Sequence, residues 1–388
     1  MNFRQLSLYS FILIALANPS LLWAARHHHP TPTPTETATD TPTPTPTPYN
    51  YTGPKLYSFD AMWGSKGSEP NQLNYPEDIA VGPDGRLFIA DTGNNRVAVW
   101  TADGEPVTTF GTFGSQSSWR NPPQFNHPTG IFVYPNKQIY VADSLNSRIV
   151  VLDVNGMVVT TWGSPGTGVG QFNLPHAMAE DHYGNIWVMD TGNSRVQIFS
   201  NLGVFNSTWG SFGTDATANT LTAVMNQPRG LALNHIDQAI VADTGNFRME
   251  VYNNGGIPVT IQGWYGEDGP NVFKDPSGVA VTPSGMAAIA DGSGRVLFYN
   301  SKNGDFEYLG EWRAKDEILN ANYAPRFRGI ACDAQNRLYI TDVQNDAVLR
   351  LKPINVPGAE PTPTPEPPTF TPTPVDSNPY GGSGFPIR

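Results

Sequence analysis

The chain has 388 residues, a formal net charge of −11 at pH 7 and a single cysteine. This acidic balance argues against a nucleic-acid partner, because phosphate binding depends on clustered Lys and Arg and the sequence contains no such cluster. The lone Cys332 excludes an internal disulfide and a cysteine-based metal knot, and its apolar neighbours predict a small buried side chain in a strand.

Residues 1–25 are typical of a secretory signal peptide, because one arginine precedes an apolar stretch that ends in Ala-Leu-Ala, a sequence suited to cleavage. We therefore expect an extracellular or cell-envelope protein, with an uncleaved membrane anchor as the alternative. Residues 26–48 and 357–388 are rich in Thr and Pro, a composition that favours extended, disordered spacers. The region between them, residues 49–356, is expected to form the folded domain.

The folded region contains six copies of an Asp-centred loop, the first of which is Ala-Asp-Thr-Gly-Asn-Asn-Arg-Val at residues 90–97. A proline lies 15 residues before the aspartate in the first five copies, and Phe327 takes its place in the sixth. Such a period indicates a repeat architecture. The aspartates are Asp91, Asp143, Asp190, Asp243, Asp291 and Asp342, with spacings of 52, 47, 53, 48 and 51 residues.

Each copy contains four short apolar runs separated by turns rich in Gly, Pro, Asn and Asp. Four antiparallel strands repeated six times predict an all-β fold, a six-bladed β-propeller of four-stranded antiparallel blades. The last copy ends after its third strand, whereas a spare strand at residues 56–63 precedes the first copy. We therefore expect this N-terminal strand to become the outer strand of the last blade and to close the ring.

The pattern Pro-x-Gly-Ile-Ala-Val, a turn, and then Tyr-Val-Ala-Asp-Thr-Gly-Asn-x-Arg-Val resembles the NHL repeat. The resemblance covers about residues 56–351; the fifth loop is one residue short, and Ala347 stands in the arginine position of the sixth copy. It implies the propeller fold. It does not fix the activity, since propellers of this family serve as sensor ectodomains, as protein- or RNA-binding modules and as lyases.

The repeated charged residues are interpreted as structural, because a residue that recurs in every blade serves a need that every blade shares. The aspartate is expected to accept backbone N–H groups of the tight loop, and the arginine to brace the loop. Besides the six aspartates, this set contains Arg96, Arg148, Arg195 and Arg248.

The position directly after the proline differs from copy to copy and is predicted to lie at the mouth of the central channel. A ligand site and solvated loop ends are both open interpretations, and Glu77 is expected to pair with Arg328. His176, Arg229 and Arg328 would suit an anionic or polar ligand. The six residues are Glu77, Thr129, His176, Arg229, Ser277 and Arg328.

The resemblance also implies what an enzyme of this kind would need. Lyase propellers place zinc-binding histidines after this proline in three blades, and only His176 matches. Lactonase-like propellers hold calcium with Glu, Asn and Asp at the channel, and only Glu77 is in place. We therefore expect neither a metal nor another cofactor.

The long loop at residues 112–127 is a candidate interface, because it carries Phe113, Trp119 and Arg120, the residue types found in interface hot spots. The sequence thus predicts a non-catalytic binding or scaffold module for a protein, peptide or glycan ligand, and a monomer. The alternative is an extracellular enzyme of lyase or lactonase type. Contact with a membrane is expected only through an uncleaved N-terminal segment.

Deletion of residues 31–48 should leave the free energy of unfolding of the domain unchanged, because a Thr-Pro segment has little apolar surface to bury. Chemical denaturation of the full chain and of the deletion variant measures this directly. A substantial loss of stability would show that the segment packs on the domain.

Overall fold

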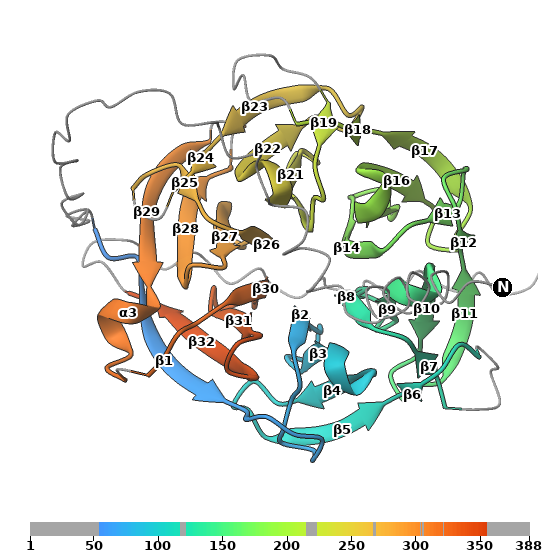
Figure 1. Cartoon of the computed structure of the whole chain (residues 1–388), viewed down its shortest axis with the longest axis horizontal. Coiled ribbons are helices and arrows are strands. Elements are labelled where there is room, and N and C mark those ends of the chain that lie inside the picture. The colour runs from blue at the N-terminus through green and yellow to red at the C-terminus, as the bar shows by residue number, and fades with distance from the viewer. Residues whose placement is uncertain are drawn as a thin grey trace, which may run out of the picture. The chain divides into compact units, whose positions relative to one another are not determined.

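The computed structural model describes residues 54–354, except 117–121, 215–222, 267–268, 303, 305 and 321. Within these ranges six four-stranded sheets surround a central axis (Figure 1), which confirms the predicted all-β, six-bladed propeller. No helix in the described part of the chain is long and apolar enough to cross a membrane. The predicted signal peptide or anchor at 1–25, the linker at 26–48 and the tail at 357–388 lie outside the described residues.

The first five blades are each continuous in sequence and run from an inner strand at the axis to an outer strand at the rim. Blade 1 contains β2 (Pro76–Val81), β3 (Leu87–Asp91), β4 (Arg96–Trp100) and β5 (Pro106–Phe110); blade 2 contains β8 (Pro128–Val133), β9 (Ile139–Asp143), β10 (Arg148–Leu152) and β11 (Val158–Trp162); blade 3 contains β14 (Pro175–Glu180), β15 (Ile186–Asp190), β16 (Arg195–Phe199) and β17 (Phe205–Trp209); blade 4 contains β20 (Gly230–Leu233), β21 (Ala239–Asp243), β22 (Arg248–Tyr252) and β23 (Pro258–Gln262); blade 5 contains β26 (Pro276–Val281), β27 (Met286–Asp291), β28 (Arg295–Asn300) and β29 (Glu307–Arg313).

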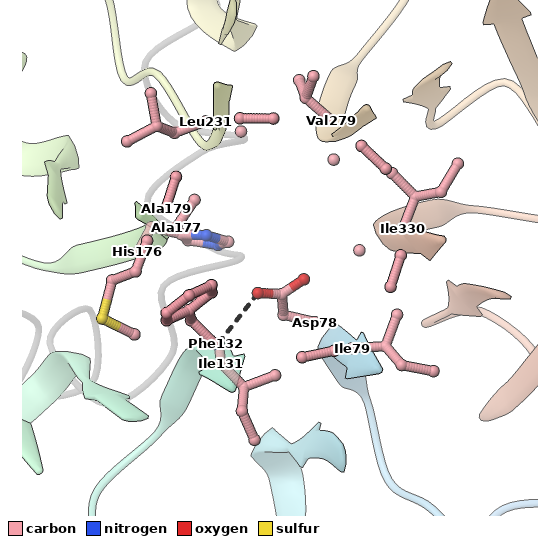
Figure 2. Close-up of a pocket in the computed structure, with 18 of the residues that line it drawn as sticks. Asp78, Ile79, Ile131, Phe132, His176, Ala177, Ala179, Leu231, Val279 and Ile330 are labelled. Carbon is pink, nitrogen blue, oxygen red and sulfur yellow. Dashed lines mark hydrogen bonds between the residues drawn. The ribbon is translucent and has the colours of Figure 1, made fainter. Parts of the chain in front are cut away.

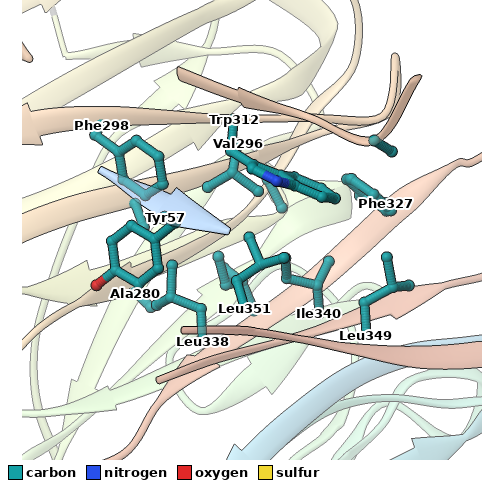
Figure 3. Packing of buried hydrophobic residues seen from close by; sticks show 14 residues of the cluster. Tyr57, Ala280, Val296, Phe298, Trp312, Phe327, Leu338, Ile340, Leu349 and Leu351 are labelled. Atoms are coloured by element: carbon teal, nitrogen blue, oxygen red, sulfur yellow. The ribbon is translucent and has the colours of Figure 1, made fainter. Parts of the chain in front are cut away.

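Blade 6 is built from both ends of the folded region. Its inner three strands are β30 (Phe327–Cys332), β31 (Leu338–Asp342) and β32 (Ala347–Pro353), and β1 (Tyr57–Trp63) pairs antiparallel with β32 as the outer strand. Tyr57 is 2% exposed, and its ring stacks on Phe298 of blade 5 at a centroid distance of 4.9 Å (Figure 3). The Tyr57 hydroxyl donates to the carbonyl oxygen of Asn336 at 2.9 Å. This strand covers an edge that would otherwise be open to pairing with other chains.

The connections between blades share one feature, a short parallel pairing of two segments. In each pairing one side chain is buried and its partner points outward. The buried members Leu73, Phe125, Phe172, Met225 and Phe273 are fully enclosed, and their partners are Lys66, Phe113, Pro165, Phe212 and Tyr265. The paired segments are β6 (Thr112–Phe113) with β7 (Gln124–Phe125), β12 (Ser164–Pro165) with β13 (Gln171–Phe172), β18 (Ser211–Phe212) with β19 (Val224–Met225) and β24 (Trp264–Tyr265) with β25 (Val272–Phe273). The connection into blade 6 carries the short helix α3 (Ala314–Glu317) instead.

The Asp-centred loops turn through single 3-10 turns in the first four blades. They lie at the same end of the propeller as the blade connections, and we call this end the loop-rich face. The hairpin turns that follow the inner and third strands form the opposite face. The four turns are η1 (Thr92–Asn94), η2 (Ser144–Asn146), η3 (Thr191–Asn193) and η4 (Thr244–Asn246).

Neighbouring inner strands touch each other through their backbones near the axis. A Cβ atom added at Gly130 would lie 1.8 Å from the carbonyl oxygen of His176, and one added at Gly278 would lie 2.3 Å from that of Arg328. Neither backbone oxygen can move without breaking its own strand. Gly130 and Gly278 are therefore required by this close approach.

Deletion of residues 56–63 should abolish cooperative folding of the domain, because it removes β1, exposes the edge of β32 and uncovers the buried apolar cluster of blades 5 and 6. Within the same strand, Tyr57→Ala should cost about 3–5 kcal/mol, whereas Met62→Ala, at a 42% exposed position, should cost under about 1 kcal/mol. Thermal and urea melts measure both effects. An unchanged melting curve for the deletion would contradict the role of β1.

Candidate functional site: the central channel and the loop-rich face

Each Asp-centred loop is organised by one buried carboxylate. Asp91 accepts the backbone N–H of Asn74 through Oδ1 at 2.7 Å, while Oδ2 accepts the Asn94 amide at 2.8 Å and Arg96 Nε at 2.6 Å. The outer nitrogens of Arg96 donate to carbonyl oxygens of the connection that precedes the blade. The carboxylate and arginine therefore fasten the blade connection to the loop, an arrangement repeated at Asp143, Asp190 and Asp243.

In blades 5 and 6 the loop is held by different hydrogen-bond partners. In blade 5, Arg295 Nε donates to the Ser293 hydroxyl at 3.0 Å. In blade 6, where Ala347 replaces the arginine, the hydroxyl of Tyr323 donates to Asp342 Oδ2 at 2.8 Å. The carboxylate is kept while its partner changes, which is the behaviour of a structural residue.

Glu77 reaches across the mouth of the channel from blade 1 to blades 3 and 4. Its Oε2 lies 3.5 Å from His176 Nε2 and 3.4 Å from Arg229 Nη1. Glu77 is 4% exposed and Arg328 is 2% exposed, so these residues are not the solvated loop ends that one interpretation of the sequence allowed. We call the contacts among Glu77, His176 and Arg229 the channel bridge.

The charge state of the channel bridge follows from burial and from its neighbours. Burial raises the pKa of Glu77, but the hydrogen-bonding His176 and the charges of Arg229 and Arg328 outweigh it, so the pKa lies well below its ordinary value. Burial lowers the pKa of His176, against the opposing effect of Glu77. At neutral pH the bridge therefore consists of a carboxylate, a guanidinium and a neutral imidazole.

The other three predicted mouth residues do not join the bridge. The expected pairing of Glu77 with Arg328 is wrong, because Arg328 Nη1 lies 2.8 Å from the carboxylate of Asp275 instead. The Ser277 hydroxyl donates to the carbonyl oxygen of Arg328 at 3.1 Å. Thr129 lies 3.2 Å from the Pro175 carbonyl oxygen, to which its hydroxyl donates. These two hydroxyls connect neighbouring blades.

Asp78 is a site residue that sequence reasoning missed. It stands two residues after the proline, where the other five copies have Gly or Ala, and this departure was the available signal. Its carboxylate points into a cavity of about 280 Å³ that runs along the channel (Figure 2). Asp78 Oδ2 accepts the backbone N–H of Ile131 at 3.0 Å, and burial, with a contribution from Glu77, raises the pKa of Asp78 to about 7.

A metal centre finds no support in the described side chains. Among them, no group of three or more His, Cys, Asp or Glu is arranged to hold a metal ion. The carboxylate of Glu77, the one residue in place for a lactonase-like calcium site, is engaged by His176 and Arg229.

The loop-rich face carries exposed aromatic side chains. Phe113 is 69% exposed, and Phe212 and Tyr265 occupy the equivalent outward position of their connections at 67% and 61%. The same pairing accommodates Lys66 and Pro165, so the fold does not demand an aromatic residue there. The other two residues predicted for this interface, Trp119 and Arg120, lie outside the described residues.

The geometry defines the class of protein, a six-bladed β-propeller whose blades are fastened by Asp-centred loops. The NHL repeat model matches residues 73–100, which contain the first of these loops, so the resemblance stated from the sequence is confirmed. The chain therefore contains an NHL repeat within a six-bladed β-propeller.

Two curated relatives match parts of the chain. NHL repeat-containing protein 3 of Homo sapiens is 32% identical over 105 residues, which is 25% of this chain and 30% of that protein. Peptidylglycine alpha-amidating monooxygenase of Rattus norvegicus is 29% identical over 122 residues, which is 29% of this chain and 12% of that protein. The chain therefore matches less than a third of the length of each relative.

Two solved structures share the architecture. A gluconolactonase from Xanthomonas campestris aligns with a TM-score of 0.53 and 18% identity, covering 73% of this chain and 87% of that one. A streptogramin B lyase aligns with a TM-score of 0.50 and 12% identity, covering 76% and 98%. At this level of identity the likeness concerns the fold alone.

Asp78→Asn should stabilise the domain at alkaline pH and not in acid. A carboxyl group whose pKa rises on folding supports the folded state fully below its unfolded pKa of about 4, and this support is lost as pH rises toward the folded value near 7. The amide keeps an oxygen for the Ile131 N–H and removes the charge. The melting temperature of the variant relative to the parent should therefore rise by several degrees, about 3–6 °C, between about pH 4 and pH 8. A difference that is flat or falls with pH would contradict this account.

Proposed function

We propose that the chain is an exported, non-catalytic binding module that takes a protein or peptide partner on its loop-rich face. The observation that carries the proposal is the recurrence of exposed aromatic residues at one outward position of the blade connections. Buried side chains beneath them already satisfy the packing of each connection. Aromatic side chains dominate the energetics of protein interfaces. Exposure of an aromatic ring to water is unfavourable, and since this fold does not require the rings, binding is the function that explains them.

Further side chains extend this surface. Trp264 precedes Tyr265 and is also exposed, and Phe247 of the neighbouring loop packs edge-on against Tyr265 at 4.9 Å. Val169 and Leu174, on the connection into blade 3, are exposed as well. The apolar residues thus occur on successive connections around one face.

Export rests on the signal-like composition of residues 1–25 and on the Thr-Pro segments. An extended segment of 18 residues such as 31–48 would span about 55 Å at ~3.1 Å per residue. Such a spacer would hold the domain away from a surface and leave its loop-rich face free for a partner.

The second candidate is an enzyme of lyase or lactonase type, the kinds of enzyme that the names of the two solved structures give. The channel bridge weighs against it, because the Glu77 carboxylate already contacts both His176 and Arg229. Elemental analysis of the purified protein separates the candidates. Stoichiometric zinc or calcium that is lost in His176→Ala or Glu77→Gln would favour the enzyme.

Replacing Phe113 and Phe212 together by serine should weaken partner binding about 100-fold, because each buried aromatic anchor contributes roughly 1–2 kcal/mol or more. The partner is first isolated by cross-linking from the envelope fraction of the native cells, and its affinity for purified wild-type and variant domains is then measured by calorimetry. The matched control is Leu202→Ser, a 79% exposed position on the opposite face, which should bind normally. Equal loss in the control, or binding of a glycan in place of a protein, would overturn the proposal.

A further inference from the structure

The cavity in the channel is narrowed at one end and more open at the other. The channel bridge, in which the side chains of His176 and Arg229 are partly exposed, and the buried side chains of Thr129, Ser277 and Arg328 narrow the end at the loop-rich face. At the opposite end the lining residues Val81, Glu180, Leu233, Val281 and Cys332 are all partly exposed. A small molecule would therefore enter from the opposite face, away from the proposed partner surface.

The wall of this cavity is mainly apolar. Figure 2 shows Phe132, Leu231, Val279 and Ile330 around the space into which the Asp78 carboxylate points. Apolar walls with few polar groups are the usual composition of small-molecule sites, and a volume of about 280 Å³ lies near the lower end of their range.

Asp78 is a carboxylate without a cationic partner in this wall. It accepts hydrogen bonds from the backbone N–H groups of Ile131 and Ile79. The two arginines that line the same cavity are engaged by other carboxylates, Arg229 by Glu77 and Arg328 by Asp275. A carboxylate that faces an apolar space with no positive charge beside it is complementary to a small cation.

The fold supplies no reason for a charge at this position. The equivalent residues of the other inner strands are Gly or Ala, and a neutral amide would serve the Ile131 N–H equally well. Burial makes the charged form costly, as its raised pKa reflects. A residue that departs from the repeat at a cost is a candidate for function.

We propose that the channel binds a small hydrophobic amine, with its ammonium group paired to Asp78 and its apolar body against Phe132, Leu231 and Ile330. The Phe132 ring lines the same cavity (Figure 2) and would add a cation–π contact. This site is separate from the loop-rich face, so the amine proposal can be tested independently of the proposed protein partner.

The affinity for an amine should rise with pH through the range in which Asp78 loses its proton. The charged or titratable groups around Asp78 are Glu77 on its own strand, His176 and Arg229 across the channel, and Arg328 on β30; Glu180 and Cys332 line the cavity toward its exposed end. Glu77 and the arginines keep their charges near neutral pH, His176 is neutral there, and burial raises the pKa of the Cys332 thiol so that it stays protonated. Burial also raises the pKa of Glu180, so Glu180→Gln is needed to assign the pH dependence to Asp78.

The test is calorimetric titration of the full chain with phenethylamine and with its neutral analogue phenethyl alcohol, at pH values about one and a half units above and below 7. The amine should bind at least about tenfold more tightly than the alcohol at the higher pH, because a hydrogen bond to a charged partner contributes roughly 1.5–3 kcal/mol. This preference should shrink at the lower pH. Asp78→Asn should abolish it while its melting curve shows a folded domain.

Two further variants locate the binding site. Glu180→Gln, a carboxylate at the exposed rim of the same channel, should retain the preference within about threefold. Ala177→Leu should block both ligands by filling the cavity, and its melting curve must show a folded domain because Ala177 stands at the small-residue position of its inner strand. The proposal is overturned by an absence of saturable amine binding, by equal affinities for amine and alcohol, by wild-type behaviour of Asp78→Asn or Ala177→Leu, or by loss of the preference in Glu180→Gln.

Discussion

The close approach of six inner strands around one axis is the constraint on which the rest of this structure depends. Where the carbonyl oxygen of His176 occupies the place of a side chain at Gly130, no larger residue fits, and the same contact recurs from Gly230 to Ser277 and from Gly278 to Arg328. The channel is narrow for this reason, and a side chain from one blade can reach the opposite blade. The bridge from Glu77 to Arg229 is possible only at such a radius.

A second consequence concerns the loop-rich face. In the first four blades the buried aspartate and its arginine fasten the connection to the loop above it, and a fully buried side chain such as Phe125 fills the space beneath. With the inward positions satisfied in this way, the outward position of each connection is free to vary. The sequence varies there from Lys66 to Pro165 to Phe212, so this position can be selected for binding without loss of stability.

The number of blades and the level of the channel mouth could be predicted because both follow from the period of the repeat and from the rigid spacing between proline and aspartate. The partners of the mouth residues could not. Glu77 was expected to pair with Arg328 of the adjacent blade, but Asp275 takes that arginine, and its position just before a proline gave no signal of a role at the axis. Contacts across a channel depend on which blades face each other and on the side-chain rotamers. The repeat pattern in the sequence gives no information on either.

Asp78 shows that an exception within a repeat can mark a functional position. Five of the six copies have Gly or Ala at this position, and the aspartate of the first copy is the departure. The aspartate in the first copy is more informative than the small residues in the others. It stands where crowding at the axis favours a small residue, and it brings a charge that burial disfavours. The channel bridge lies between Asp78 and the loop-rich face. A ligand on Asp78 and a partner on the aromatic residues would therefore bind on opposite sides of this bridge.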